Sequence, residues 1–218
     1  MTHVVKPGNI IAYLVGKAKA STKEAWVRDL DKVWDAMTEV TFNQKGFLAM
    51  KALWNLDNSR NILVLAFWNS LPERLAYEKA AAGGVRANME TTLVGPPPRP
   101  KYEVVRAMGA PLEGIKVGHV AAILSAKARA ATSAEYAKEL DKVWSGATDI
   151  LTKRPGNIGA HVLYNIEGTR EVHSIGYWAS LADRMAYENS VSRQVQGRFE
   201  QTLEPPYPRP RYLIVKTT

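Results

Sequence analysis

The five residues Leu30 to Trp34 recur, letter for letter, as Leu140 to Trp144. The offset between the two copies is 144 − 34 = 110 residues, and matches continue at this offset without a gap through most of the chain. The matched positions include rare residues and turn residues: Gly46/Gly156, Asn55/Asn165, Trp68/Trp178, Tyr77/Tyr187, Arg99/Arg209 and Tyr102/Tyr212. Chance does not place so many matches at one offset, so the sequence predicts a tandem duplication with two similar folding units.

Length and composition fit two modest globular units. The chain has 218 residues, of which 46% are hydrophobic and 23% charged, as in soluble proteins. We expect a first repeat over residues 1–108, a linker over 109–118 and a second repeat over 119–218. No apolar run approaches the roughly 20 residues that a membrane helix needs. Cysteine is absent, which excludes disulfides and thiolate chemistry and fits a cytoplasmic location.

The net charge of +8 has two interpretations. A basic protein attracts anions such as nucleic acid, a membrane surface or acidic metabolites. However, nucleic-acid-binding proteins usually gather Lys and Arg on one face, and here these residues are scattered along the chain. We therefore expect an ordinary solvated basic surface, with neither a nucleic acid nor a membrane as partner.

Each repeat is predicted to contain strands and helices in one order. A first strand over residues 10–17 precedes a helix that we expect to begin with a capping box at Ser21 and Glu24. Strands over 47–56 and 62–68 flank a turn at residues 57–59, and a second helix begins with a capping box at Ser70 and Glu73. A proline-rich bend then leads to a strand over 102–106. The second repeat shows the same signals, with capping boxes at Thr132 with Glu135 and Ser180 with Asp183.

This order, β-α-β-β-α-β, is the ferredoxin-like arrangement, in which helices cover one face of a four-stranded antiparallel sheet. If the other face were exposed to water, its strands should alternate apolar and polar residues. The stretch Ile62 to Trp68 is instead apolar at both its odd and its even positions, which point to opposite faces of the sheet. We therefore predict an α+β protein whose two sheets pair face to face into a closed intrachain barrel with the helices outside, so that one chain forms a pseudo-dimer.

The segments Phe67 to Leu71 and Tyr177 to Leu181, each a strand end followed by a helix start, carry a family resemblance. Together with the doubled ferredoxin-like order, they resemble the dimeric α/β-barrel superfamily, and within it the antibiotic biosynthesis monooxygenase family. The resemblance covers nearly the whole chain. It implies the barrel fold strongly and function only weakly, because that superfamily includes cofactor-free oxygenases, haem-degrading enzymes, isomerases and cyclases.

Trp68 and Trp178 align with the pocket tryptophan of that family. The resemblance implies a ring that lines a site for an aromatic ligand, and the alternative is a core residue at the strand–helix corner. Tyr77 and Tyr187 follow on the second helix, where a phenol can donate a hydrogen bond or move a proton. The alternative for this pair is packing at the helix–sheet seam.

Two further pairs are candidates for substrate binding. Arg74 and Arg184 each precede a glutamate by four residues, and such an arginine can hold an anionic oxygen or form an ordinary helix ion pair. Asn55 and Asn165 end a strand, where they can contact a ligand or stabilise a turn.

The repeats differ at His161 and His173, where the first repeat has Lys51 and Leu63. Equal parity on adjacent strands places both imidazoles inside the barrel. They can serve as a catalytic base, bind a metal with a carboxylate such as Glu171, or form a hydrogen-bonded interior pair. We expect no metal and favour the base, with one half active and the other mainly structural.

The resemblance implies a cofactor-independent monooxygenase acting on an aromatic or polyketide-type phenol, with no cofactor. The alternatives are a non-catalytic binder of haem or a small anion, and a proton-transfer isomerase or cyclase. Haem-degrading members of the superfamily carry a haem-ligating His on the second helix, and neither second helix has one here, which disfavours haem. A small aromatic molecule is the expected partner, and a further homodimer remains open.

Overall fold

Each half of the chain forms the same series of elements. The computed structural model describes residues 2–57 and 60–218, so part of the predicted turn at residues 57–59 lies outside it. The first half contains β1 (Ile10–Lys17), α1 (Lys23–Phe42), β2 (Phe47–Asn55), β3 (Asn61–Trp68), α2 (Leu71–Ala80), α3 (Ala82–Glu90) and β4 (Lys101–Gly109). The second contains β5 (Val120–Ala128), α4 (Ser133–Leu151), β6 (Asn157–Asn165), β7 (Glu171–Trp178), α5 (Leu181–Ser190), α6 (Ser192–Glu200), β8 (Leu203–Glu204) and β9 (Arg211–Thr217).

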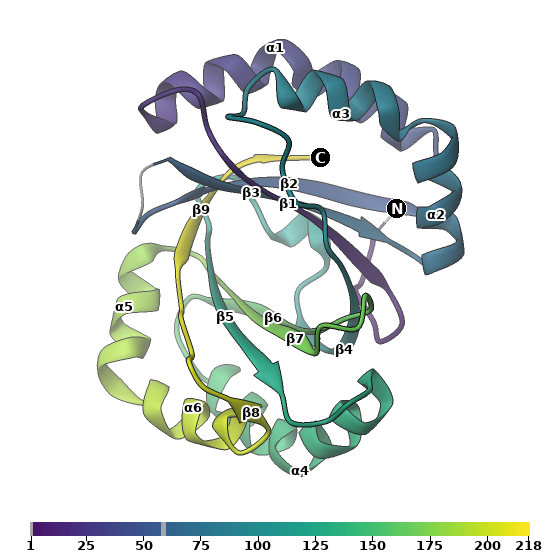
Figure 1. Ribbon diagram of the computed structural model, residues 1–218. Helices are drawn as coiled ribbons and strands as arrows, with labels where there is room; N and C mark the ends of the chain where they lie inside the picture. The colour runs from purple at the N-terminus through teal and green to yellow at the C-terminus, as the bar shows by residue number, and fades with distance from the viewer. Residues whose placement is uncertain (1, 58–59) are drawn as a thin grey trace.

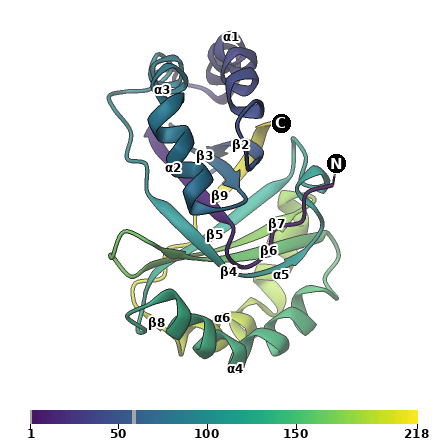
Figure 2. The same cartoon turned by 90° about the vertical axis from the view of Figure 1, so that its right-hand side faces the viewer.

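The strands close into one antiparallel ring between two helical layers (Figures 1 and 2). Around the ring the order is β1, β3, β2, β9, β5, β7, β6 and β4, and the short β8 pairs with β5. The last strand of each half connects the halves: β4 pairs with β1 and then with β6, and β9 pairs with β5 and with β2. The prediction of an α+β intrachain barrel is confirmed.

The first helix of each half begins at a threonine. Thr22 caps α1, its hydroxyl accepting a hydrogen bond from the Ala25 backbone N–H at 3.3 Å. The predicted capping box at Ser21 was therefore wrong by one residue. The box at Thr132 and Glu135 is confirmed, because each side chain accepts from the other residue's backbone N–H.

The predicted second helix is two helices in each half. α2 ends where Ala81 takes φ −135° and ψ −16°, and α5 ends where Val191 takes φ −118° and ψ 4°. These angles lie outside the helical region, so the chain changes direction at each break. As a result α2 and α3, or α5 and α6, cover two different parts of the same sheet (Figure 1).

Both faces of the barrel strands are covered, which explains why their side chains are apolar on both faces. One set of buried residues, including Trp26, Leu30 and Trp68, packs between the sheet and α1–α3. A second equivalent set packs under α4–α6. A third set fills the barrel interior and mixes residues of both halves, such as Leu65 with Ile175.

Residues 109–118 do more than connect the halves. They contain the 3-10 turn η1 (Leu112–Gly114), and Leu112 and Ile115 are buried in the interior cluster. Lys51, which is 0% exposed, points to the same region and donates to the carbonyls of Leu112 and Ile115 at 3.0 and 2.9 Å. The predicted linker therefore packs against the barrel.

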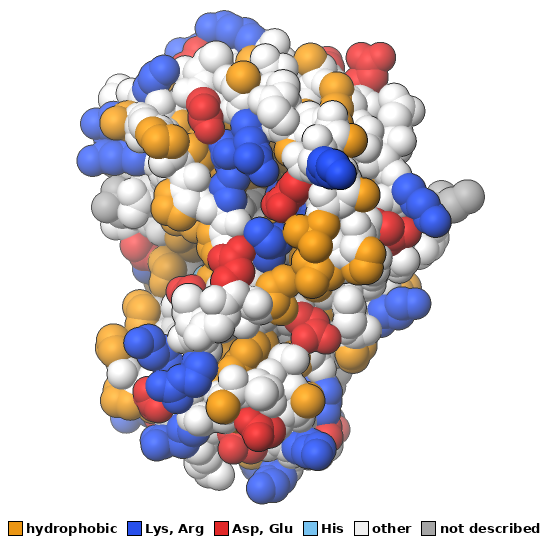
Figure 3. Space-filling model, turned by 45° about the vertical axis from the view of Figure 1, so that its right-hand side comes forward, with side chains coloured by type: hydrophobic (Ala, Val, Ile, Leu, Met, Phe, Trp, Pro, Cys, Tyr) orange, Lys and Arg blue, Asp and Glu red, His pale blue; other side chains and the backbone are white. Residues whose placement is uncertain are grey.

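On the face of the molecule shown in Figure 3, positive and negative side chains are not separated into patches. Lys and Arg side chains lie there among acidic and hydrophobic ones. Among the helices in residues 2–57 and 60–218, none combines the length and apolar character required to cross a bilayer.

The seam between β4 and β6 yields a stability prediction. Gly109 and Gly159 lie opposite each other, and a Cβ at Gly159 would come 2.5 Å from the Met108 carbonyl oxygen. Because that neighbour is backbone, Gly159→Ala should lower the free energy of unfolding by about 1–3 kcal/mol, as overpacking does. Gly84→Ala is the control: no atom lies within 4 Å of its Cβ position on α3, so it should be neutral or stabilising by about 0.5–1 kcal/mol. Urea denaturation of both variants measures this, and equal stabilities would contradict a tight seam.

Candidate functional site

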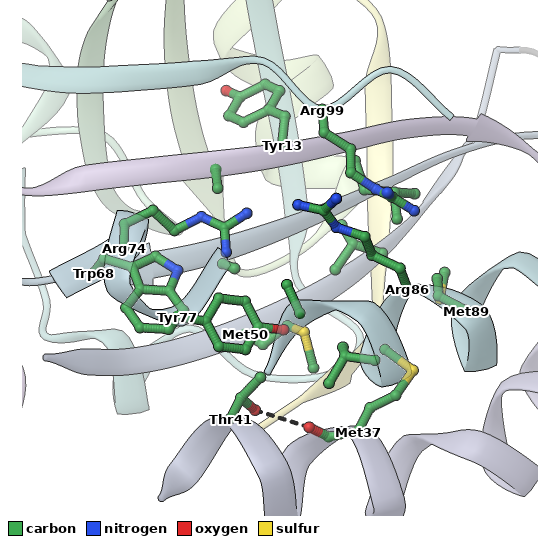
Figure 4. Close-up of a pocket in the computed structure, with 16 residues that line it drawn as sticks. Tyr13, Met37, Thr41, Met50, Trp68, Arg74, Tyr77, Arg86, Met89 and Arg99 are labelled. Atoms are coloured by element: carbon green, nitrogen blue, oxygen red, sulfur yellow. Dashed lines mark hydrogen bonds between the residues drawn. The ribbon is translucent and has the colours of Figure 1, made fainter. Parts of the chain in front are cut away.

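A pocket lies between the outer face of the first half's sheet and its helices (Figure 4). Trp68 ends β3, and Ser70 caps α2 at once, its hydroxyl accepting from the Glu73 N–H. The immediate helix start brings the α2 side chains beside the indole. The rings of Trp68 and Tyr77 are 4.8 Å apart and tilted by 31°, and the Arg74 guanidinium carbon lies 5.4 and 5.0 Å from their centroids.

The second half builds the same pocket. The rings of Trp178 and Tyr187 are 4.8 Å apart at 32°, and the Arg184 guanidinium carbon lies 5.7 and 5.1 Å from them. The structure thus brings together three of the predicted pairs, a tryptophan, a tyrosine and an arginine in each half. Duplicate geometry this close indicates that the sequence of each half determines its own cluster.

The arginines are buried cations held by carboxylates. Arg74 Nη2 lies 3.1 Å from Glu78 Oε1, and Arg184 Nε lies 2.9 Å from Glu188 Oε1. Burial lowers the pKa of both arginines, yet guanidinium stays protonated in proteins. Each pocket therefore keeps a positive charge next to two aromatic rings.

The tyrosines keep their hydroxyl protons at neutral pH and can therefore donate a hydrogen bond. Burial raises the pKa of Tyr77, and it raises the pKa of Tyr187 to about 12. The indole N–H groups of Trp68 and Trp178 are also buried, and neither has a hydrogen-bond partner in the described part of the chain. A polar ligand atom can satisfy such a donor.

The open space in each pocket is small, about 70 Å³ in the first half and about 60 Å³ in the second. A dry cavity of roughly 150 Å³ accepts benzene, so a ring enters only if lining side chains move. The first pocket is lined by Met37, Met50 and Met89, whose unbranched side chains adapt readily.

Asn55 and Asn165 lie away from the pocket linings. Each ends a strand and accepts a backbone hydrogen bond two residues on, from Asp57 N–H at 2.8 Å and from Glu167 N–H at 2.7 Å. This is the turn geometry that asparagine favours. Neither asparagine is among the residues that line the two tryptophan pockets.

His161 and His173 lie in the barrel interior, on the sheet face opposite to the pockets. His161 is opposite Ile175, and His173 is opposite Leu163, across the β6–β7 ladder. His161 packs with its ring centroid 5.1 Å from that of Tyr177. The interior location is confirmed, but neither imidazole lines a tryptophan pocket, so neither is placed to act there as the base.

The two histidines also have different partners. His173 stacks on Tyr102 at 4.6 Å, with Nε2 3.2 Å from Glu171 Oε1. The Nδ1 atoms of both histidines are buried and without a partner among the described residues. Within the same residues no group of three His, Cys, Asp or Glu side chains is arranged to hold a metal ion.

Two arginines of the first pocket were missed from the sequence. Arg86 on α3 extends its guanidinium group toward that of Arg74, and Arg99 in the proline-rich bend lines the same pocket (Figure 4). Arg99 has a matched partner, Arg209, in the second pocket, and this repeated Arg-Pro pair was a usable signal. Arg86 has Gln196 at the equivalent position, so the repeat offered no signal for it.

Comparison with known proteins shows similarity in structure. No protein-family profile matches the chain, and no curated protein matches it in sequence. A candidate monooxygenase from Fusobacterium nucleatum has a TM-score of 0.72 at 10% identity, covering 98% of this chain and 95% of its own. An anthrone oxidase-like protein has a TM-score of 0.63 at 16% identity, covering 98% and 94%. A candidate monooxygenase from Lactobacillus acidophilus NCFM has a TM-score of 0.68 at 8% identity, covering 97% and 96%.

The chain therefore has the dimeric α/β-barrel fold, with both halves in one polypeptide. Its solved neighbours include monooxygenase-like proteins, one of them a ferredoxin-fold protein of Listeria monocytogenes related to antibiotic biosynthesis monooxygenases, and they also include a candidate chlorite dismutase. The resemblance found in the sequence is confirmed at the level of fold. Nearly complete coverage in both directions shows that these neighbours span both halves as well.

The interior histidine yields a pH prediction. Burial, and to a lesser degree Lys51, lowers the pKa of His161 from 6.5 to about 3. Between these values the unfolded chain binds a proton that the folded protein does not, so this residue makes stability fall as pH falls from 6.5 toward 3. The slope is at most about 1.4 kcal/mol per pH unit. His161→Leu lacks this contribution. Urea denaturation from pH 7 to pH 4 should show the variant losing less stability than the parent, and parallel curves would contradict it.

Proposed function

We propose that the chain is a cofactor-independent, monooxygenase-type enzyme that oxidises aromatic phenols with molecular oxygen in its helix-covered pockets. The observation that carries this proposal is the Trp–Tyr–Arg cluster, which each half builds with nearly the same distances. A mostly apolar hollow with a few convergent polar groups is typical of a small-molecule site.

The residues suggest how a phenol would bind. Its ring would lie against the indole of Trp68, and its oxygen would approach Arg74 and the Tyr77 hydroxyl. A nearby guanidinium favours the ionised form of a bound phenol and so lowers its pKa. No carboxylate or imidazole belongs to either lining among the described residues. The pocket would therefore act by stabilising the phenolate, with the proton passing to water.

The chemistry would follow from the substrate's own electron density. A phenolate or its carbanion form transfers an electron to O₂, and the two radicals join in a new carbon–oxygen bond to give a peroxide. At a ring CH₂ group, cleavage of the O–O bond leaves one oxygen on carbon as a carbonyl, and the other leaves as water with the two hydrogens. Four electrons leave the substrate and O₂ accepts four. The protein would contribute orientation, desolvation and charge stabilisation.

The structural neighbours support this class of function. Their descriptions include monooxygenases and an anthrone oxidase-like protein, and anthrone has the acidic CH₂ group that such chemistry requires. The small-anion binder remains an alternative, favoured by the gathering of Arg74, Arg86 and Arg99 (Figure 4). Haem binding is disfavoured, because α2, α3, α5 and α6 contain no histidine.

Oxygen consumption with anthrone tests the proposal. The purified protein should accelerate it above the uncatalysed rate, and Arg74→Met combined with Arg184→Met should reduce the rate by about 10²-fold, as the loss of a transition-state charge partner does. Lys32→Met is the control, since this lysine is exposed on α1 with 73% of its side chain accessible, and it should retain the full rate.

Three other outcomes would contradict the proposal. No acceleration by the parent protein would remove the oxygenase assignment. Binding of anthrone without oxygen uptake would support the non-catalytic binder. Conversion of anthrone under nitrogen would support the isomerase or cyclase instead.

A further inference from the structure

The two pockets can be compared residue by residue. At the offset of 110, each residue that lines the second pocket corresponds to a lining residue of the first. Trp68, Arg74, Tyr77 and Arg99 have identical counterparts. The remaining differences are therefore the positions at which the two pockets differ in charge, size and shape.

The main difference in charge is at one position. Arg86 of the first pocket corresponds to Gln196 of the second. Arg86 Nη2 is 4.0 Å from Glu78 Oε1, a carboxylate already paired with Arg74 at 3.1 Å and with Lys101 at 3.6 Å. The charge of Arg86 is thus only partly compensated by this shared partner.

The numbers of cations and carboxylates in the ion pairs around the two pockets differ. The first has four cations and three carboxylates: Arg74, Arg86, Arg99 and Lys101, with Glu78, Glu90 and Glu167. The second has three of each: Arg184, Arg209 and Arg211, with Glu188, Glu200 and Asp57. Arg154 is a further cation near Tyr187, and like Lys101 and Arg211 it lines neither pocket. Among the lining residues themselves, the first pocket has three arginines, Arg74, Arg86 and Arg99, and the second has two, Arg184 and Arg209, so the first carries one more positive charge.

The additional positive charge, that of Arg86, lies where a substituent on a bound ring would reach it. Figure 4 shows the guanidinium group of Arg86 turned toward that of Arg74, while Arg99, which also lines the pocket, has its Nη2 2.6 Å from Glu90 Oε1. Arg86 is on α3 and Arg99 is in the proline-rich bend, so different elements bring them together. Planar guanidinium groups match the two oxygens of a carboxylate.

The pockets also differ in the stiffness of their walls. Met50 and Met89 of the first pocket correspond to Ala160 and Phe199 of the second. Methionine side chains adapt to different shapes, whereas a phenylalanine ring has few conformations. The first pocket is therefore better suited to a substituted ring.

We propose that the first pocket is selective for aromatic carboxylates and the second for phenols without a carboxylate, with Arg86 as the residue that determines the difference. The ligand's carboxylate would lie between Arg86 and Arg99 while its ring packs against Trp68. This inference rests on the proposed function, because it assigns different ligand classes to the two copies of one site.

Calorimetric titration with salicylate and with phenol tests this assignment, since the two probes differ by one carboxylate. The parent protein should bind one salicylate tightly. Arg86→Gln converts the first pocket to the charge of the second and should weaken salicylate binding by about tenfold, the effect of losing one charge-assisted hydrogen bond. Gln196→Arg is the reciprocal change and should raise the salicylate stoichiometry from one to two.

Arg28→Gln is the control for the loss of charge alone, because Arg28 is exposed on α1 and lines neither pocket. It should leave salicylate affinity within twofold of the parent. Circular dichroism of each variant should report an unchanged fold, as position 86 is 39% exposed.

The possible failures are distinguishable. Two equal salicylate sites in the parent protein, or unchanged salicylate affinity in Arg86→Gln, would overturn the assignment while leaving the pockets as phenol sites. Absence of binding by both probes would overturn the assignment and the proposed function together. An equal loss in Arg28→Gln and Arg86→Gln would mean that net charge, rather than this position, governs binding.

Discussion

The structure depends on burying the inner face of each sheet against the other half. Strands that are apolar on both faces cannot leave one face in water, and each half has helices for only one. The interior cluster is built from both halves, and β4 and β9 pair with strands of the opposite half. Barrel closure therefore pairs the backbone N–H and C=O groups at the sheet edges and, at the same time, buries the apolar inner faces.

This arrangement decides where ligand sites can form. The barrel interior holds buried side chains, including Lys51 and His161, and a hollow of about 340 Å³ lined by Tyr13, Tyr102 and His173 among others. The two tryptophan pockets lie instead between the sheet and the helices. There β3 and its counterpart β7 each end in a tryptophan, and a capped helix, α2 or α5, follows directly. The helices α1–α3 and α4–α6, which cover the first and second pocket respectively, lie on opposite sides of the barrel (Figure 2). One pocket can therefore change in charge without disturbing the other, as the Arg86 and Gln196 pair illustrates.

The sequence predicted the fold and the core of the site for identifiable reasons. The repeat fixed the number of units, and the apolar strands required a partner sheet. The alternation of side chains along β6 and β7 predicted that His161 and His173 lie inside the barrel, where the structure places them. It could not show that neither would line a tryptophan pocket, where a catalytic base had been expected. Arg86 and Arg99 reach the site from a second helix and a bend. The spacing of residues along a single helix or strand does not show which side chains from different elements meet at one pocket. The break at Ala81 depends on a single backbone conformation.

The most direct test of this account is the sedimentation of the first half alone, residues 1–109. Its β4 would need a second copy's β2 to complete the ring, just as β4 pairs with β6 in the full chain. We expect the isolated half to sediment as a homodimer, or to lack cooperative unfolding when dilution separates the copies. A monomer that unfolds cooperatively at all concentrations would show that one sheet is stable with its inner face in water, and would contradict the shared barrel core.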